Sequence, residues 1–276
     1  LPPMPRIIHT GQALVDATAM IPALPRRGQN VMAAGWSQEA GGAVNILAAA
    51  ARSGATCVHA GAIGTGPNGD LVREALQVEG VGWCAPAVED ADTALCVVLV
   101  EPSAERTFVT MLGAERQLSL PGLEVSEPVP GDLVCVTGYS LAVPSTRDPL
   151  LAWLPTLAPG VEVVLDPGAV FETLPADLQE RVLALTTVWT SNQEEATALT
   201  GLDGMAEAAD AVAALLPPGA VAIVRDGPQG CAVRAEGRTD VVVGYPQEPV
   251  DTNGAGDAHT GVLLAAVVIN ALIGFI

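Results

Sequence analysis

The order of apolar and polar positions along the chain predicts an α/β fold. Short apolar runs, typical of strands buried on both faces, fall at residues 95–100, 133–137, 161–166, 188–191 and 220–225. Longer segments with helical patterns alternate with them, at residues 43–53, 70–79, 176–185 and 205–216. Continuous apolar strands joined by helices predict a mainly parallel central sheet with helices on both faces, which is a three-layer sandwich.

Two segments, at residues 10–38 and 93–112, interrupt this pattern. Their apolar and polar residues alternate, and glycine and proline mark turns, which is typical of antiparallel strands. We expect these segments to form a small β lid attached to the main part of the fold. The chain has 276 residues and contains no linker, low-complexity tract or internal repeat, so residues 1–276 are predicted to form a single domain.

The charge of the chain argues against two classes of partner. It contains 31 acidic and 12 basic residues, a formal charge of −19, and every basic residue is an arginine. Nucleic acids are bound by clustered cations, and anionic membrane surfaces repel an acidic protein, so we expect neither partner. The apolar stretch at residues 262–276 is only 15 residues long, which is too short for a membrane-spanning helix.

The cysteines indicate a reducing environment. All five are scattered and form no C-x-x-C pair, so we predict neither a disulfide framework nor a zinc site. No signal-peptide pattern stands at the start of the sequence, and a cytoplasmic location is therefore expected.

The sequence DTNGAGD at residues 251–257 is the strongest indication of chemistry, and an apolar helical run follows it. Its small residues Gly254, Ala255 and Gly256 would leave free backbone N–H groups at the positive end of that helix, which form an anion hole for a phosphoryl group. Asp257 would lie in the first turn, where its carboxylate can accept the proton of an attacking hydroxyl. An ordinary glycine turn followed by an acidic first-turn residue is the alternative interpretation.

Five further motifs follow one another along the chain. They are GQALVD at residues 11–16, GGAVN at 41–45, ERT at 105–107, SNQEE at 191–195 and RDGPQG at 225–230. Together with the D-T-x-G-A-G-D string, this series resembles the ribokinase-like (PfkB) family of carbohydrate kinases over residues 6 to about 264. The resemblance implies a ribokinase-like α/β fold and an ATP-dependent carbohydrate kinase, with Asp257 as the catalytic base beside Gly254, Ala255 and Gly256.

The resemblance also implies roles for the residues of these motifs. Substrate hydroxyls would be held by Asp16, Gly41, Gly42 and Asn45. The nucleotide would be held by Asn192, Glu195, Arg225, Gly227 and Gly230. Glu195 would organise Mg²⁺ through water, and a monovalent cation such as K⁺ would be held by Asp251 and Asn253. The alternative interpretations are structural, with Asp16 in a turn, Asn192 as a helix N-cap and Glu195 as a solvated first-turn acid.

Some positions depart from the family pattern. The glycine–asparagine element is one residue shorter than G-G-x-x-x-N, Gly66 stands where many members carry an aspartate, and Leu14 replaces an asparagine. Little sequence follows the 251–257 string, whereas the family continues with a further helix and strand, so we expect the C-terminal part to be truncated or incomplete. His259, two positions after Asp257 on the same helix, is expected to be a packing or surface residue. A homodimer formed through the lid is a further implication of the resemblance.

The substrate class depends on the positive charges available near the lid. A phosphorylated sugar would need a cation at its distal phosphate. The substrate-side segments offer Arg26, Arg27, Arg52, Arg73 and Arg106, two of them on predicted helices and one in a lid turn. With a chain charge of −19, a small neutral sugar is the predicted substrate, and a nucleoside is the alternative.

A second glycine string leaves a function of another class open. GTGPNG at residues 64–69 satisfies G-x-G-x-x-G, and Glu89 lies 20 residues after Gly69. This is the fingerprint of an NAD-dependent oxidoreductase, but the string also fits the substrate-side G-x-x-x-x-G turn of the kinase family. Because the chain contains no lysine, it has neither a P-loop G-x-x-x-x-G-K-[ST] nor a protein-kinase strand lysine.

Overall fold

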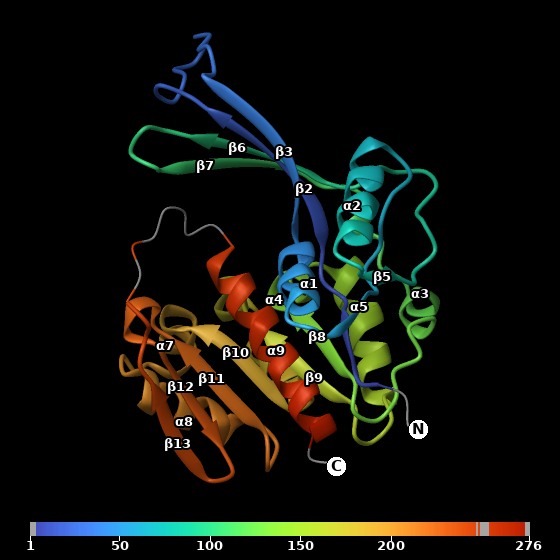
Figure 1. The fold of residues 1–276 in the computed structure, drawn as a ribbon, viewed down its shortest axis with the longest axis vertical. Coiled ribbons are helices and arrows are strands. Elements are labelled where there is room, and N and C mark those ends of the chain that lie inside the picture. Colours follow the sequence, from blue (N-terminus) through green and yellow to red (C-terminus); the bar gives the residue numbers. More distant parts are fainter. Residues whose placement is uncertain (1–3, 247, 249–253, 274–276) are drawn as a thin grey trace.

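The computed structural model of the protein describes residues 4–246, 248 and 254–273, and within them the largest element is a nine-stranded sheet (Figure 1). Its strands are β1 (Arg6–His9), β4 (Thr56–His59), β5 (Gly82–Trp83), β8 (Leu133–Thr137), β9 (Glu162–Asp166), β10 (Val188–Asn192), β11 (Val221–Arg225), β12 (Cys231–Ala235) and β13 (Arg238–Val242). They are arranged in the order β13–β12–β11–β10–β9–β8–β1–β4–β5. Neighbours from β5 to β11 are parallel, and β12 pairs antiparallel with both β11 and β13. The prediction of a mainly parallel sheet is confirmed.

Helices cover both faces of this sheet, which makes the fold three-layered. One face is covered by α1 (Ala43–Arg52), α2 (Pro67–Val78) and α9 (Ala255–Ile273). The other face is covered by α3 (Leu120–Glu124), α4 (Gly138–Leu141), α5 (Pro144–Trp153), α6 (Ala176–Leu183), α7 (Gln193–Thr200) and α8 (Met205–Leu215). In β8, Leu133 and Cys135 pack toward the first group, and Val134 and Val136 pack toward the second. The strands are apolar on both faces because each face meets a helix layer.

A separate four-stranded sheet forms the lid and projects away from the main sheet (Figure 1). Its strands are β2 (Ala13–Met20), β3 (Gly35–Gly42), β6 (Leu95–Val100) and β7 (Arg106–Met111), in the order β3–β2–β6–β7. The pairs β2–β3 and β6–β7 are antiparallel as predicted, but β2 and β6 pair in parallel, which the sequence pattern did not predict. The apolar run at 95–100 resembles the core strands, yet it lies in the lid because Cys96, Val98 and Val100 form a small apolar cluster there.

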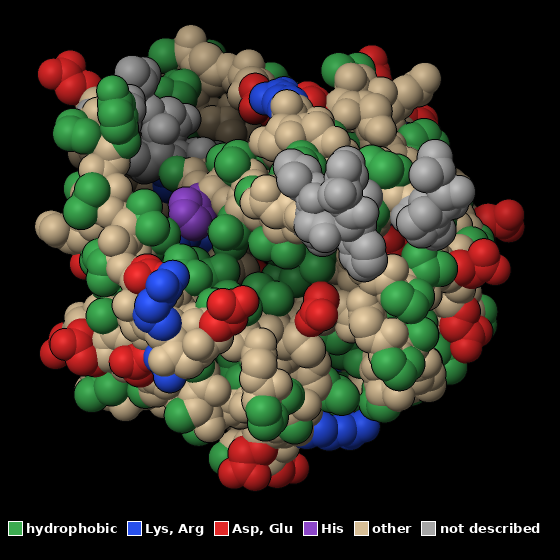
Figure 2. Space-filling view, turned by 60° about the horizontal axis from the view of Figure 1, so that its bottom comes forward, with side chains coloured by type: hydrophobic (Ala, Val, Ile, Leu, Met, Phe, Trp, Pro, Cys, Tyr) green, Lys and Arg blue, Asp and Glu red, His purple; other side chains and the backbone are tan. Residues whose placement is uncertain are grey.

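The surface carries the acidic excess of the sequence. On the face seen in Figure 2, acidic side chains are scattered over the whole outline and basic side chains are few. Among the helices of the described ranges, none combines the length and the apolar character needed to cross a membrane.

Candidate active site

A pocket of about 1480 Å³ lies at the carboxyl ends of the parallel strands, between the lid and the start of α9. Ligands of open α/β sheets bind at this edge. The residues of the predicted site that line it are Gly42, Asn192, Glu195, Arg225, Gly227, Gly230, Ala255, Gly256 and Asp257. Asn45 contacts this set through Asp257, and Gly254 directly precedes α9. Asp251 and Asn253, the predicted ligands of a monovalent cation, lie outside the described residues.

The start of α9 faces the pocket, with the geometry expected of an anion hole. Gly254 has a φ of 69°, a left-handed conformation that favours glycine and turns the chain into the helix. The first helical hydrogen bond runs from the N–H of Ala258 to the carbonyl oxygen of Gly254, at 2.8 Å. The N–H groups of residues 255–257 precede it and have no acceptor within the helix, so they are available to an anion.

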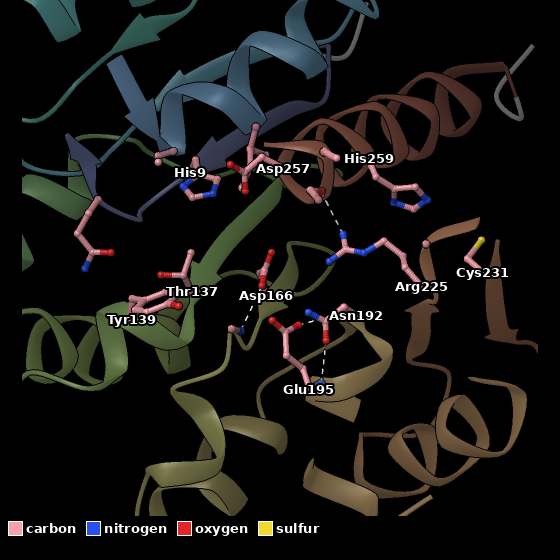
Figure 3. A pocket seen from close by; sticks show the side chains of 18 of the residues that line it. His9, Thr137, Tyr139, Asp166, Asn192, Glu195, Arg225, Cys231, Asp257 and His259 are labelled. Carbon is pink, nitrogen blue, oxygen red and sulfur yellow. Dashed lines mark hydrogen bonds between the residues drawn. The ribbon is translucent and has the colours of Figure 1, made fainter. Parts of the chain in front are cut away.

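Asp257 lies in the first turn of α9 and lines the pocket (Figure 3). Asn45 of α1 donates from Nδ2 to its Oδ2 at 3.1 Å, which leaves Oδ1 without a donor among the described side chains. Burial raises the pKa of Asp257, and the hydrogen bond from Asn45 and the charge of Arg225 act in the opposite direction. Asp257 is thus a fixed carboxyl group beside the free N–H groups of its own helix.

Asp16 lies on β2 next to the glycine pair that ends β3. A Cβ atom on Gly41 would collide with Oδ2 of Asp16, so glycine at this position makes room for the carboxylate. Burial raises the pKa of Asp16, and the charges of Asp257 and Glu39 raise it further. Asp16 lies within a strand, so the alternative interpretation as a turn residue is wrong.

Asn192 and Glu195 form a capping box at the start of α7. The N–H of Glu195 donates to Oδ1 of Asn192 at 2.8 Å, and the N–H of Asn192 donates to Oε2 of Glu195 at 3.0 Å. The interpretation of Asn192 as a helix N-cap is therefore confirmed. The side chains of Asn192 and Glu195 also line the pocket, so the capping role does not exclude contact with a nucleotide. Burial raises the pKa of Glu195, whose side chain is half-buried in the first turn of α7.

Arg225 connects the end of β11 to the start of α9. Its Nη1 donates to Oγ1 of Thr260 at 2.6 Å and to the carbonyl oxygen of Gly256 at 3.2 Å. Figure 3 shows Arg225 on the opposite side of the pocket from Thr137 and Tyr139. A cation in this position contributes positive charge next to the free N–H groups of α9.

Asp166 is a pocket residue that the motif series did not include. It ends β9, and Figure 3 places it between Asp257 and the capping box of α7. Shielding from bulk water raises its pKa to about 7, and the charges of Glu195 and Asp257 act in the same direction, against the charge of Arg225. A signal for it exists in the sequence, because Asp166 is the acidic end of a predicted apolar strand and Pro167 and Gly168 follow it.

The raised pKa of Asp166 predicts a pH dependence of stability in the nucleotide-free protein. Between pH 3.8 and about 7 the folded state keeps a proton that the unfolded chain releases, so stability falls as pH rises through this range. One such group contributes a slope of up to about 1.4 kcal/mol per pH unit. Urea unfolding between pH 5.5 and 8 should show a flatter pH profile for Asp166→Asn than for the unchanged protein. Identical profiles of stability against pH for the two proteins would contradict a raised pKa of Asp166.

Two histidines also line the pocket. His9 ends β1, and its Nδ1 accepts a hydrogen bond from the N–H of Gly11 at 3.1 Å. Burial, together with the neighbouring His59, lowers the pKa of His9 to about 3, so its ring is neutral at physiological pH. His259 also lines the pocket, on the side of Arg225 (Figure 3), and its expected role as a packing or surface residue stays a prediction. No motif signal marked either residue, because pocket position depends on contacts distant in sequence.

The glycine string at 64–69 has a structural explanation. The carboxylate of Asp92 accepts hydrogen bonds from the N–H groups of Asn68 and Gly69 at the start of α2, at 3.1 and 2.9 Å. A Cβ atom on Gly66 would collide with Asp92, so glycine is needed for this contact. A dinucleotide pyrophosphate would have to displace this carboxylate from the helix terminus. The start of α2 is therefore not available as the dinucleotide-binding site that the oxidoreductase interpretation requires.

Solved structures share the fold. The chain matches Arabidopsis thaliana ribokinase, complexed with ribose and ATP, with a TM-score of 0.76 and 23% identity over 96% of this chain and 86% of that one. It matches adenosine kinase from Sinorhizobium meliloti with a TM-score of 0.78 and 19% identity over 96% of this chain and 88% of that one. At such identities the likeness shows the fold, which is ribokinase-like, as predicted.

Sequence relatives define the family. The chain is 30% identical over 264 residues to an Escherichia coli K12 protein described as the uncharacterized sugar kinase YegV, covering 95% of this chain and 81% of the relative. It is 26% identical over 264 residues to ribokinase of Haemophilus influenzae, covering 94% and 84%. The family described as pfkB family carbohydrate kinase matches residues 4–271. The chain belongs to the pfkB family of carbohydrate kinases, as the motif series predicted.

Proposed function

We propose that the protein transfers the γ-phosphoryl group of ATP to a hydroxyl of a small neutral sugar. The observation that carries this proposal is Asp257 in the first turn of α9, beside the free N–H groups of residues 255–257 and inside one pocket. Phosphoryl transfer needs a positioned base and donors for the oxygens of the moving group.

The proposed reaction uses these positions. The substrate hydroxyl oxygen attacks the γ-phosphorus, the bond from that phosphorus to its bridging oxygen breaks, and ADP leaves. The hydroxyl proton goes to Oδ1 of Asp257, because Asn45 donates to Oδ2. The N–H groups of residues 255–257 and the guanidinium of Arg225 stabilise the negative charge on the phosphoryl oxygens.

The nucleotide-side residues fit ATP with Mg²⁺. The charge of Glu195 contributes to the raised pKa of Asp166, and a cation near both carboxylates would relieve this repulsion. Glu195 and Asp166 line the pocket and would hold Mg²⁺ through water, because Mg²⁺ usually keeps several waters and binds through one or two carboxylates. When bound, Mg²⁺ neutralises charge on the transferring phosphates. Gly227 and Gly230 line the pocket and would accommodate the nucleotide, and K⁺ at Asp251 and Asn253 remains part of the proposal.

Two carboxylates at the acceptor end support a neutral substrate. Asp16 and Asp257 would repel an anionic group, whereas both can accept hydrogen bonds from sugar hydroxyls. Asn45, Gly41 and Gly42 complete the substrate side of the proposal. A nucleoside is the second candidate, because apolar side chains of Leu14, Ile46 and Leu112 line the same pocket and could cover a base.

Assembly and location are also part of the proposal. The lid exposes a group of large apolar side chains, Met32, Trp36, Phe108, Val109 and Leu112. Burying such a group in a homodimer through the lid would remove it from water. We further propose that the chain acts as one domain in the cytoplasm, without a nucleic-acid or membrane partner.

A coupled ADP-release screen tests the substrate class. Purified protein with ATP and Mg²⁺ is offered pentoses, hexoses, nucleosides and hexose phosphates. The strongest turnover is expected with a neutral pentose or hexose. Turnover restricted to phosphorylated sugars would contradict the neutral-substrate proposal, and quenching of nicotinamide fluorescence on titration with NADH would favour the oxidoreductase alternative.

A further inference from the structure

Arg116 is a cationic residue of the pocket that none of the sequence motifs includes. It ends the short 3-10 helix Ala114–Arg116, which follows β7 of the lid, and its side chain lines the pocket. Its Nη1 donates to the carbonyl oxygen of Tyr139, which lies in α4, two residues after the end of β8. β8 is three strands from β11, which carries Arg225, and this separation is about 14 Å at ~4.8 Å per strand. Arg116 therefore lies at the substrate end of the pocket, away from the nucleotide side.

Most of the N–H groups of Arg116 have no acceptor in the described part of the chain. The hydrogen bond to Tyr139 is long, at 3.4 Å, and Nε is buried without a hydrogen-bond acceptor. A guanidinium presents five N–H donors in a planar fork, and buried donors in folded proteins are normally paired. A ligand that brings acceptor oxygens to this end of the pocket would pair them.

The charge of Arg116 is already balanced by Glu115. Oε1 of Glu115 lies 3.6 Å from Nε of Arg116, and the Glu115 side chain is 2% exposed. Its two carboxylate oxygens accept from the N–H groups of Gly113 and Ala94, each at 3.0 Å, which fixes the carboxylate beside Arg116. The pair is neutral as a unit, and the pocket also contains Asp257. A substrate that carries a carboxylate or a phosphate would therefore meet little net positive charge at Arg116.

An amide group lies at the same end of the pocket. Gln12 lines the pocket, and its Nε2 donates to Oγ of Ser140, the residue after Tyr139, at 3.1 Å. Its Oε1 has no donor among the described residues and can accept from a hydroxyl. Arg116 supplies hydrogen-bond donors and Gln12 supplies an acceptor. Together they match hydroxyl groups of a substrate, because a hydroxyl group both donates and accepts hydrogen bonds.

We propose that Arg116 determines substrate specificity by binding neutral oxygens, such as a vicinal diol, at the end of the sugar remote from the phosphorylated hydroxyl. This inference rests on the proposed kinase function and deepens it by naming the residue that selects the acceptor. It also corrects the expectation from sequence about which arginines approach the substrate. Of the arginines in the described ranges, Arg116 and Arg225 line the pocket, and Arg26, Arg27, Arg52, Arg73 and Arg106 do not.

Replacement of Arg116 by lysine separates binding from structural support. Arg116→Lys keeps a positive charge beside Glu115 but loses the planar fork. With the best neutral acceptor among D-ribose, D-arabinose, D-fructose and D-glucose, KM for the sugar is expected to rise at least about tenfold. KM for ATP and the Tm should stay unchanged. Arg52→Lys is the matched control, because Arg52 is an exposed residue of α1 that pairs with Glu79 on the surface.

The outcomes distinguish this proposal from its alternatives. An unchanged sugar KM in Arg116→Lys overturns the proposal, and so does an equal loss of sugar affinity, ATP affinity and Tm, which would indicate a structural role. The unchanged protein should also prefer D-glucose over D-gluconate. A preference for the acid that disappears in Arg116→Lys would overturn the assignment to neutral oxygens. Absence of ADP release with every compound would instead refute the proposed function on which the inference rests.

Discussion

Asp257→Asn is expected to lower the turnover number by about 10²–10⁴-fold, the usual contribution of a general base. Asparagine has nearly the same shape, and its carbonyl oxygen can still accept the hydrogen bond that Asn45 now donates at 3.1 Å. The amide cannot take up the proton of the substrate hydroxyl, so the loss should appear in kcat. The measurement is steady-state ADP release with the best acceptor and saturating ATP, together with the Tm.

The matched control for this variant is Asp70→Asn. Asp70 is also an acidic residue in the first turn of a helix, α2, but its side chain is 77% exposed and does not line the pocket. Its turnover should equal that of the unchanged protein. Full turnover in Asp257→Asn would mean that another group accepts the proton.

Gly254→Val is expected to reduce turnover by about 10²–10³-fold, comparable to the loss of an oxyanion-hole donor. A Cβ atom at this position would lie 3.6 Å from Nδ2 of Asn45 and 3.9 Å from Oδ2 of Asp257. The branched side chain would therefore crowd the base, and the φ of 69° would strain the turn that aims the N–H groups of α9.

Gly219→Val is the control that distinguishes backbone strain from damage to the anion hole. Gly219 has a φ of 85°, and a Cβ atom there would meet no atom within 4 Å, so this variant suffers a similar backbone strain outside the pocket. Its Tm should fall and its kcat should not. If Gly254→Val turned over as fast as Gly219→Val, the start of α9 would not be an anion hole.

The sequence predicted the main sheet well because its strands are apolar on both faces and short. The run at 133–137 is β8 in the structure, and the runs at 188–191 and 220–225 differ from β10 and β11 by one residue at one end. The lid was predicted less well. Local alternation predicts the hairpins of β2 with β3 and β6 with β7, but the parallel pairing of β2 with β6 joins segments about 80 residues apart, and no local pattern encodes it.

The site residues divide in the same way, into those that a local sequence pattern marks and those that depend on contacts distant in sequence. Motif strings indicated Asp257, Asn45 and the capping box, because each belongs to a short segment with its own backbone geometry. Arg116 and Asp166 enter the pocket through the packing of the 3-10 helix Ala114–Arg116 and of β9 against distant elements, and their own neighbours in sequence carry no recognisable string. The glycines of 64–69 show the reverse case, in which a string that matches a binding motif serves a contact with Asp92.

Phosphorus NMR of the reaction mixture tests the central claim most directly. The protein is incubated with ATP, Mg²⁺ and the best acceptor from the screen, and the fate of the γ-phosphorus is followed. The proposed function predicts that the γ-phosphorus signal of ATP is replaced by one phosphomonoester signal on the acceptor, in equal amount to the ADP formed, and that Asp257→Asn slows this conversion. Formation of ADP with inorganic phosphate and no phosphomonoester, or no loss of ATP with any acceptor, would contradict it.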